Sequence, residues 1–486
     1  MKIYELLNKS FKCLQKENEL DLAIIYKLSL TKNRFPQYKK KGIFGHSILK
    51  KLFSGLNYIF SSITFFSQSN KKSCQIYAFS SSENQLSSMA TTLKSIKLKK
   101  MNLYLTTLNN NSSIKKPPVK SYRVVYSFKI LLVGLVLFLF KGITLFKKLK
   151  KIKKKSYNFS FFFYYLIQIY LFIPYFIDLL SKLNPKIVLM SNDHSISNRC
   201  LRFVSEMHQV KTIYMQHASV SIDYPPLEFD YAFLDGVKAY ETYAKCSKNI
   251  KNLKKNTLKN IRKCKIFLTG VKKNIYLPTP LKNNRKQIIG IATSVADNFD
   301  YVYNLLNCLR EFNIRCIIRT HPNQSEVFAK KLKIFVKQSS NFTQSNAKSE
   351  TISAFFGKIN IFIGSNTNMH LEAAMCNLPT FYYKFNNLKG SSNDYGFLKS
   401  GLSIKLLKKF DHNYFKKKIK LINFSQRKKI IKNFSETYNT YWQNKEGELS
   451  TIIIDRILNN LQFSDLFKTH NSKIFHSINK LKQKKL

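Results

Sequence analysis

A histidine and an arginine stand together where a short apolar run ends. The stretch CIIRTHPNQ contains Arg319 and His321, and Pro322 restricts His321 to extended backbone. An imidazole held there can donate a hydrogen bond to a phosphate oxygen, and Arg319 adds a fixed positive charge. An isolated His-Pro pair also fits a purely structural role, in which the histidine caps a helix and the proline fixes the turn.

A second stretch, INIFIGSNTNMHLEAA, places small polar residues between an apolar run and a helical segment. Ser365, Asn366 and Thr367 would stand at the helix start, where backbone N–H groups and the helix dipole attract an anion. Glu372 follows about one turn later, where its carboxylate could reach ribose hydroxyls. An ordinary N-cap by Ser365 or Thr367 is compatible with this interpretation. We expect His370 on the helix surface.

Three further runs in the first half of the chain also end in polar residues. They supply Asp193, His194 and Arg199 in LMSNDHSISNR, Gln216 and His217 in YMQHASVS, and Asp235 in DYAFLDG. His217 or Asp235 could take a proton from an attacking hydroxyl. Each also has a structural alternative: Asp193 as an N-cap, His217 as a buried hydrogen-bonded histidine, and Asp235 as a turn residue.

The elements that must position these residues alternate regularly along the chain. Short β-branched runs are separated by helical segments of roughly 10 to 15 residues, which indicates parallel, doubly wound sheets. One series runs from about 74 to 270, interrupted by long apolar helices at 122–148 and 159–182, and a second from 287 to 384. Ligands of such sheets bind beyond the carboxyl ends of the strands. The polar strand ends of both series should therefore face one cleft.

The expected organisation is a two-lobed α/β protein with two Rossmann-like sheets. The stretch LPTPLKNNRK carries two prolines and a polar cluster typical of a hinge. Residues 425–462 are expected to be helical and to pack back across the joint. The domains expected are a basic N-terminal extension at 1–70, a first Rossmann-like domain at 71–276, a hinge at 277–286, a second Rossmann-like domain at 287–462 and a basic tail at 463–486.

A formal net charge of +56 on 486 residues raises the question of a nucleic-acid partner. The excess is mostly lysine and accompanies many Asn, Ile, Phe and Tyr, a bias that an AT-rich genome also produces. Basic residues alternate with aromatic clusters, as in LFKKLKKIKKKSYNFSFFFYY, which suits an anionic membrane surface better than a DNA groove. We therefore expect the inner-membrane surface and no specific nucleic acid as a partner.

The apolar runs, the cysteines and the first residues indicate where in the cell the protein is expected. The run 130–140 is too short for a span of about 20 residues, whereas 159–177 is a possible membrane helix for which a buried or interfacial position is preferred. The eight cysteines show no framework spacing, which favours a reducing compartment. The charged MKIYELLNKS lacks the apolar core of a signal peptide. We expect a cytoplasmic protein associated peripherally with the membrane.

The sequence lacks the motifs of several common enzyme classes. The chain has no GxGxxG, Walker loop, HExxH or GxSxG pattern, which argues against dinucleotide redox, ATP hydrolysis, zinc proteolysis and α/β-hydrolase chemistry. No DxD-like acidic cluster suggests a nucleotide-bound divalent metal. We expect a metal-independent phosphate site and no cofactor.

The motifs QHAS, RTHP and GSNTNMHLEAAMCNLPTFYY together resemble bacterial GT-B glycosyltransferases of surface polysaccharide synthesis, over residues 186–385. The similar families include capsule sialyl- and polysialyltransferases, Kdo-transferring capsule enzymes and CDP-glycerol glycerophosphotransferases. The resemblance implies that His321, Ser365 and Thr367 hold the donor phosphate. It implies a base at Asp235 in the sialyltransferase branch, where the chain has Leu234 in place of a second acid. In the glycerophosphotransferase branch it implies His217, followed here by Ala218 instead of glycine.

The function expected from the residues and the resemblance is an inverting, metal-independent sugar transfer. The donor would be a nucleotide sugar, and the acceptor a surface polysaccharide or a lipid-linked glycan such as capsule or lipopolysaccharide. A glycerophosphotransferase and a nucleotide-sugar epimerase are the alternatives within enzymes. A basic membrane- or nucleic-acid-binding protein without catalysis is the alternative of another class.

Overall fold

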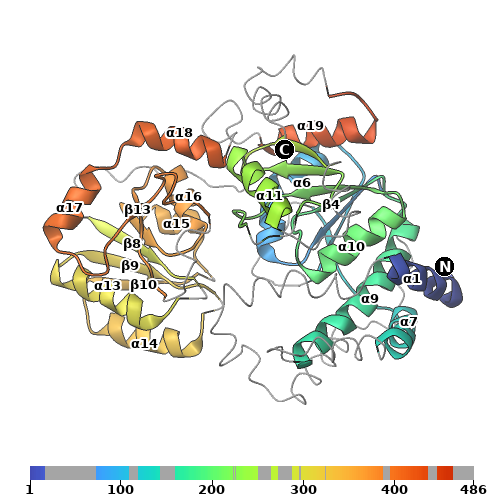
Figure 1. Ribbon diagram of the computed structural model, residues 1–486, viewed down its shortest axis with the longest axis horizontal. Helices are drawn as coiled ribbons and strands as arrows, with labels where there is room; N and C mark the ends of the chain where they lie inside the picture. Colours follow the sequence, from blue (N-terminus) through green and yellow to red (C-terminus); the bar gives the residue numbers. More distant parts are fainter. Residues whose placement is uncertain are drawn as a thin grey trace.

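The chain folds into two lobes, each built on a parallel sheet (Figure 1). The structure, a computed structural model, describes residues 1–16, 73–108, 119–142, 159–222, 224, 226–249, 264–271, 287–294, 297–322, 324–347, 349–386, 395–435 and 446–463. The expected hinge at 277–286, residues 17–70 of the expected extension and all of the expected tail except Phe463 lie outside the described residues.

The first lobe contains a seven-stranded parallel sheet in the order β3-β2-β1-β4-β5-β6-β7. Its strands are β1 Ile76–Ser80, β2 Leu103–Thr107, β3 Ser121–Arg123, β4 Ile187–Met190, β5 Lys211–Met215, β6 Tyr231–Leu234 and β7 Lys265–Leu268. The central strands β1 and β4 are buried along their whole length. Burial on both faces is what continuous apolar runs require of a parallel sheet.

The second lobe contains a six-stranded parallel sheet in the order β10-β9-β8-β11-β12-β13. Its strands are β8 Ile288–Ala292, β9 Arg315–Arg319, β10 Phe342–Ser345, β11 Ile361–Gly364, β12 Thr380–Tyr382 and β13 Ile404–Lys405. The predicted pair of Rossmann-like sheets is thus confirmed. The edge strands β3, β10 and β13 were not predicted, because they are short and partly polar and carry little apolar pattern.

Helices cover both faces of each sheet. The first sheet has α1 Ile3–Lys16, α7 Phe128–Leu137, α9 Phe159–Leu183, α10 Ile196–Met207 and α11 Val237–Asn249 on one side, and α6 Glu83–Leu98 and α19 Glu446–Leu458 on the other. The second sheet has α13 Phe299–Glu311, α14 Glu326–Lys337 and α17 His412–Lys420 on one side, and α15 Ile352–Phe356 and α16 Met369–Met375 on the other. The remaining helix, α18 Phe424–Phe434, lies towards the joint between the lobes.

Short polar residues fix where these helices begin and end. The Ser195 hydroxyl accepts a hydrogen bond from the N–H of Asn198 at the start of α10, and Ser325 does the same for Phe328 at the start of α14. Asn313 adopts a left-handed conformation with φ of 53° just after α13. Asparagine tolerates this backbone better than most residues, so these boundaries are set locally.

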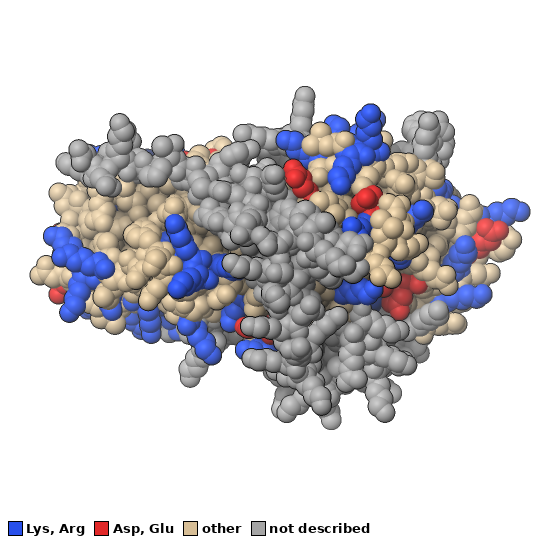
Figure 2. Space-filling view, turned by 90° about the horizontal axis from the view of Figure 1, so that it is seen from above, with Lys and Arg blue, Asp and Glu red and all other residues tan. Residues whose placement is uncertain are grey.

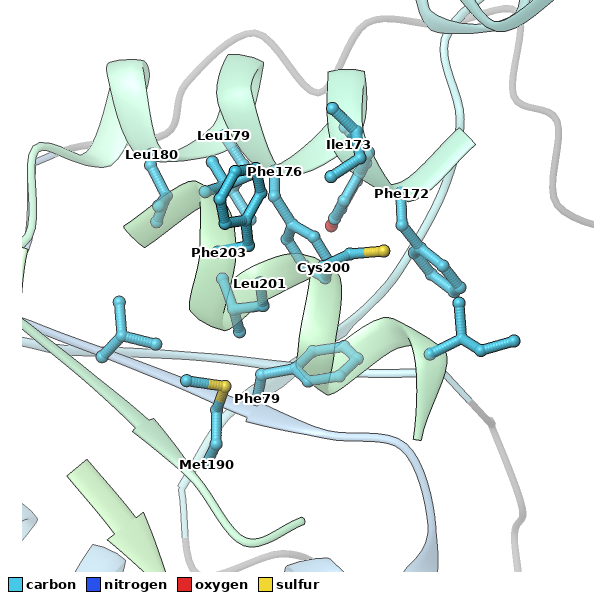
Figure 3. Close-up of a cluster of buried hydrophobic side chains, with 14 of the residues drawn as sticks. Phe79, Phe172, Ile173, Phe176, Leu179, Leu180, Met190, Cys200, Leu201 and Phe203 are labelled. Atoms are coloured by element: carbon cyan, nitrogen blue, oxygen red, sulfur yellow. The ribbon is translucent and has the colours of Figure 1, made fainter. Parts of the chain in front are cut away.

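The core of the first lobe is built around α9. Phe172 and Phe176 point from α9 towards Phe79 of β1 and the side chains of α10 (Figure 3), with the rings of Phe79 and Phe176 5.3 Å apart and nearly perpendicular. In the part of the chain that the structure describes, no helix has the length and apolar character needed to cross a bilayer. The side chains of residues 159–166, in the first part of the possible membrane helix at 159–177, lie outside the described residues. Within this segment the side chains from Ile169 to Ile177 are buried in the core of the first lobe, and Ile167 is partly buried against the same core.

The regions around α7 and α1 differ from the sequence-based expectation. The helix expected at 122–148 begins only at Phe128, since residues 121–123 pair with β2, and it continues as a π-helix, η1 Phe138–Gly142. Residues 143–148 lie outside the described residues. Within the expected N-terminal extension, residues 3–16 form a helix whose Leu6, Cys13 and Leu14 are buried against the rest of the lobe. Cys13 and Leu14 lie seven and eight residues beyond Leu6, spacings that put these side chains on one helix face.

The last described helix returns to the first lobe, which confirms the prediction that the chain packs back across the joint. Ile453, Ile454 and Ile457 of α19 share a core with α6. A Cβ atom on Gly447 would lie 2.6 Å from the backbone of Thr91, so the two helices can approach this closely only with glycine there.

Positive charge is spread over the surface. Lysines 416, 417, 420, 428, 429 and 432 are exposed on α17 and α18, where Asp411 at the α17 N-cap is the nearest described carboxylate in the sequence. Seen from above, Lys and Arg side chains outnumber Asp and Glu over both lobes (Figure 2). Among the described residues visible on this face, the charge does not gather into a single band of the kind a nucleic-acid groove shows.

Candidate functional site

The ends of β5 and β6 bring two predicted site residues together. The Gln216 backbone N–H donates to the carbonyl of Phe233, and the Gln216 side-chain oxygen accepts a 2.9 Å hydrogen bond from the N–H of Asp235. The Gln216 side-chain amide donates to the carbonyl of Ala218 at 2.9 Å. Gln216 therefore joins the two strand ends and holds Asp235 beside the loop that carries His217.

These residues face a small pocket between the lobes. Gln216, His217 and Asp235 line it from the first lobe, and Asn368 and Glu372 line it from α16 of the second. Asp235 and Glu372 are both buried. The pocket encloses about 20 Å³, which is room for about one water molecule. Two carboxylates and an imidazole thus converge where the lobes meet.

Direct contacts fix the lobes around this pocket. The backbone N–H of Ser219 donates to the side-chain oxygen of Asn368 at 3.1 Å. The N–H of Val271, just beyond β7, donates to the hydroxyl of Ser435 at the end of α18. Gly236 lies so close to α18 that an added Cβ would stand 2.7 Å from the carbonyl oxygen of Asn433.

The end of β4 places two other predicted residues behind His217. His194 Nδ1 lies 2.7 Å from one oxygen of Asp193, whose other oxygen accepts a 2.7 Å hydrogen bond from the Tyr243 hydroxyl. Burial raises the pKa of Asp193. The hydrogen bonds from His194 and Tyr243, together with the interaction with the charge of His194, lower it by a larger amount, so the net shift of the pKa is downward. The rings of His194 and His217 are 5.9 Å apart. An ionised Asp193 thus orients His194 next to His217.

The two arginines among the predicted residues lie outside the pocket lining. Arg199 is buried on α10. Arg319 is buried at the end of β9, where its guanidinium donates to the Ser345 hydroxyl at 3.0 Å and to the Glu350 carbonyl at 2.9 Å. The Glu350 carboxylate lies 3.7 Å from the same guanidinium. Arg319 therefore holds the segment after β10, and binding of a donor phosphate by Arg319 stays a prediction.

His321 and the 364–368 turn lie at the same end of the second sheet, beyond the carboxyl ends of β9 and β11. Arg319 is aligned with Ala292 of β8, and Ala292 with Gly364 of β11, so two strand spacings separate Arg319 from Gly364, about 10 Å. His321 follows two residues beyond Arg319. Burial lowers the pKa of His321, so the imidazole is neutral at neutral pH and still donates one N–H.

The 364–368 turn is anchored by an aspartate that the sequence analysis did not single out. The Ser365 hydroxyl donates to the Asp297 carboxylate at 2.7 Å, and the N–H of Ser294 donates to it at the same distance. Thr367 Oγ1 accepts from the N–H of Met369, and Asn366 is half-buried. The Ser365 hydroxyl hydrogen is thus used inside the lobe, and the predicted contact of this turn with phosphate is left to backbone N–H groups, Asn366 and Thr367.

Burial raises the pKa of Asp297 to about 6, although several hydrogen bonds lower it. In the unfolded chain the carboxyl titrates near 4, so between about pH 4 and pH 6 the folded state binds more protons. The free energy of unfolding should therefore fall as the pH rises through this window. The Asp297→Asn variant lacks this titration, and its stability relative to the parent chain should rise by about 3 kcal/mol from pH 4 to pH 7. Denaturant unfolding across this pH range measures the difference.

The matched control is Asp300→Asn, at an exposed position on α13. Because its side chain is exposed, its stability difference from the parent chain should change with pH much less than that of Asp297→Asn. If the stability difference between Asp297→Asn and the parent chain also stayed constant with pH, the Asp297 carboxyl would have the same pKa in the folded and unfolded states. Burial would then not raise its pKa, and the prediction would be wrong.

His370 is a correction to the sequence analysis, which expected it on the surface. It is fully buried, its Nε2 lies 2.8 Å from the Ser365 carbonyl oxygen and its Nδ1 2.9 Å from the Ser403 hydroxyl. Burial lowers its pKa to about 4. The expectation failed because α16 is covered on that side by residues about 30 positions further along the chain, which no local pattern shows.

Asp297 was missed as a member of the site's framework, and so was the contact that Asn368 of the predicted 364–368 loop makes with the other lobe. Asp235 directly follows β6, whereas Asp297 comes five residues after the end of β8, so the strand-end rule could have found Asp297 only if it were extended to the whole segment between β8 and α13. Asn368 offers no such signal, since its role depends on Ser219 of the other lobe. Among the residues that the structure describes, no group of three or more His, Cys, Asp and Glu is arranged to hold a metal ion.

Comparison with solved structures identifies this architecture as the GT-B fold. The S. aureus MnaA–UDP structure matches with a TM-score of 0.51 and 12% identity, covering 80% of this chain and 97% of that chain. The calicheamicin glycosyltransferase CalG4 matches with a TM-score of 0.50 and 7% identity, covering 79% and 98%. A Listeria monocytogenes protein described as a UDP-N-acetylglucosamine 2-epimerase matches with a TM-score of 0.50 and 10% identity, covering 80% and 98%.

At these identities the likeness establishes the fold and leaves the reaction open. No family model matches the chain, and no curated protein matches it in sequence.

Proposed function

We propose that this GT-B protein transfers a sugar from a nucleotide-activated donor to a hydroxyl of a glycan acceptor. The observation that carries the proposal is the meeting of Gln216, His217 and Asp235 with Asn368 and Glu372 in one pocket between two parallel sheets. The carboxyl ends of strands are where such sheets bind ligands. The neighbours named above include a UDP complex and a glycosyltransferase, which supports a nucleotide sugar as the ligand.

The first lobe supplies the base in this proposal. Asp235 or His217 accepts the proton of the attacking hydroxyl, and the transfer inverts the anomeric centre because acceptor and leaving group lie on opposite sides of it. The hydrogen-bonded pair of Asp193 and His194 lies behind His217, so the surroundings of the His217 ring are polar on that side. No metal takes part in these steps.

The second lobe holds the donor. His321 and the 364–368 turn lie on one sheet edge, where N–H donors can stabilise charge on the leaving phosphate. Glu372 would accept hydrogen bonds from the ribose hydroxyls. In this proposal Ser365 acts through Asp297, by keeping the turn in shape, because its hydroxyl hydrogen already goes to that carboxylate.

The lobes have to separate for the donor to enter. Ligand pockets for nucleotide-sized molecules are several hundred Å³ in volume, far more than the roughly 20 Å³ present. Opening would break the hydrogen bond between Ser219 and Asn368 at small cost, and it would also have to loosen the contacts of Gly236 and Val271 with the end of α18. Closure would then bring the base of one lobe against the donor held by the other.

The acceptor in this proposal is a surface polysaccharide or a lipid-linked glycan, as in capsule or lipopolysaccharide synthesis. The support for this part is the resemblance of QHAS, RTHP and GSNTNMHLEAAMCNLPTFYY to transferases of that kind. The sugar is to be found experimentally.

Thermal unfolding with CMP, CDP, UDP and GDP tests the donor site directly. A nucleotide present at a hundredfold excess over its Kd stabilises the folded chain by about 2.7 kcal/mol, which raises Tm by several degrees. One nucleotide should raise Tm and the others much less. A response to none of them, at concentrations that saturate ordinary GT-B proteins, would remove the donor assignment.

His321→Ala should lower turnover about a hundredfold, the usual effect of losing one donor that stabilises transition-state charge. The matched control is His412→Ala, since His412 packs on Phe312 at the other end of the same sheet. Turnover of that variant should stay near the parent value. Near-normal turnover of His321→Ala would show that this imidazole does not contact the leaving phosphate.

A nucleotide-sugar epimerase is the second candidate, because a protein described as one shares the fold. Analysis of products in the absence of any acceptor distinguishes the two reactions, since only the epimerase converts the sugar nucleotide alone. A glycerophosphotransferase would respond to CDP and form a phosphodiester. A binding protein without catalysis would show salt-dependent binding to nucleic acid or vesicles and no stabilisation by nucleotides.

A further inference from the structure

The outer side of α7 and η1 carries a row of large apolar side chains that are open to solvent. Phe128, Leu132, Leu135, Leu139 and Phe140, the α7 face, are 66, 36, 55, 50 and 71% exposed. Steps of four, three and four residues place the first four along one side of the helix. Single exposed apolar residues are ordinary, but a contiguous row marks a surface that binds something.

The opposite side of the same helix is already buried in the first lobe. Ile130, Val133 and Leu137 belong to its core, and a Cβ on Gly134 would lie 3.0 Å from the Tyr170 carbonyl oxygen of α9. The helix is therefore apolar on both sides. Such a helix is normally covered all round, so a partner is needed for the α7 face.

Exposed lysines of α1 lie beside the α7 face. The helix α1 packs beside it, with the rings of Phe11 and Phe140 6.4 Å apart, and exposes Lys2, Lys9 and Lys12. In the sequence that follows η1, residues 147–155 contain seven lysines and no acidic residue. Lysines around an apolar row complement a surface that is anionic outside and apolar beneath, which describes a bilayer with acidic lipids.

We propose that the α7 face docks the protein on an anionic lipid bilayer. Its apolar side chains enter the boundary between headgroups and acyl chains, while the α1 lysines contact lipid phosphates. In Figure 1 α1 and α7 lie on the side of the first lobe away from the second lobe, so docking leaves the joint between the lobes free to open. This inference does not depend on the proposed catalysis.

Sedimentation of the full chain with vesicles tests the proposal. With vesicles of equal parts phosphatidylglycerol and phosphatidylcholine, the double variant Leu135→Ser, Leu139→Ser should bind at least about tenfold more weakly than the parent chain. The matched control replaces two exposed apolar residues of α14, Val327→Ser and Ile334→Ser, and should bind like the parent. Vesicles of phosphatidylcholine alone should bind the parent weakly, because the lysines then lack their partners.

A reporter at the same place gives a second readout. Leu135→Trp should show a blue shift of its emission, relative to the parent chain, when acidic vesicles are added. An unshifted emission, or equal vesicle binding by the α7 double variant and its control, overturns the proposal. So does a loss of binding in Phe424→Ser alone, which would place docking on α18. A dimer in solution that the α7 double variant dissolves, without vesicle binding by the parent, would assign the face to a second copy.

Discussion

Asp235→Asn is expected to lower the turnover of the proposed transfer by about a hundredfold to ten-thousandfold, the range for loss of a general base. Asp235 is buried, lines the interlobe pocket and shares it with His217. If Asp235 is the base, asparagine cannot accept the proton. If His217 is the base, the lost carboxylate charge no longer stabilises the imidazolium that forms beside it. Either way kcat falls, while the KM for the donor changes little.

Steady-state kinetics with the donor found by thermal unfolding measures this loss. The control is Glu241→Gln, which removes an exposed carboxylate of α11 in the same lobe and should leave kcat unchanged. His217→Ala identifies the base: with His217 in that role, the rise of kcat/KM with pH that deprotonation of the base causes in the parent disappears in the variant. Turnover within about threefold of the parent in Asp235→Asn would exclude both forms of the proposal.

Gly236→Ala should lower turnover by about a hundredfold through geometry alone. An added Cβ would lie 2.7 Å from the Asn433 carbonyl oxygen, 2.9 Å from the carbonyl carbon of Phe434 and 3.0 Å from the nitrogen of Ser435. All three are backbone atoms and cannot rotate away, so α18 and the second lobe have to move. A displacement of about 1 Å in the joint is enough for a loss of this size, because Asp235 is the preceding residue.

Small-angle scattering should show a larger radius of gyration for Gly236→Ala than for the parent chain under the same conditions. Asn433→Ala is the matched control, since it shortens the side chain and keeps the backbone carbonyl that meets Gly236. Its kinetics and dimensions should match the parent. Unchanged turnover in Gly236→Ala would mean that the closed contact seen here is not the catalytic arrangement.

The ends of the strands could be predicted from the sequence because the pattern that marks them involves only neighbouring residues. A buried run that stops at a polar residue identifies both the strand and the residue beyond it, as with Gln216, Asp235 and His321. The two-sheet plan followed from the same alternation, and the GT-B fold implied by the resemblance is confirmed. The link to capsule or lipopolysaccharide synthesis stays a proposal.

What each candidate side chain contacts was decided by the tertiary structure. Arg319 looked like a free cation for phosphate, yet Glu350 and Ser345 hold it, and Ser365 is bound to Asp297, 68 positions earlier. Such pairs depend on which strands become neighbours. The order of strands in a sheet is set by packing of the whole lobe and leaves no mark at the residues themselves.

The sequence by itself determined the two parallel sheets, most of their helices and the polar edges, because periodicity and strand ends are properties of neighbouring residues. Only the tertiary structure decided that Ser219 meets Asn368 across the joint and that Gly236 touches α18. It also decided that α9 lies in the core while the outer side of α7 is exposed, although both are apolar. The composition of a helix makes it apolar, but the elements that pack against it determine which of its sides is buried.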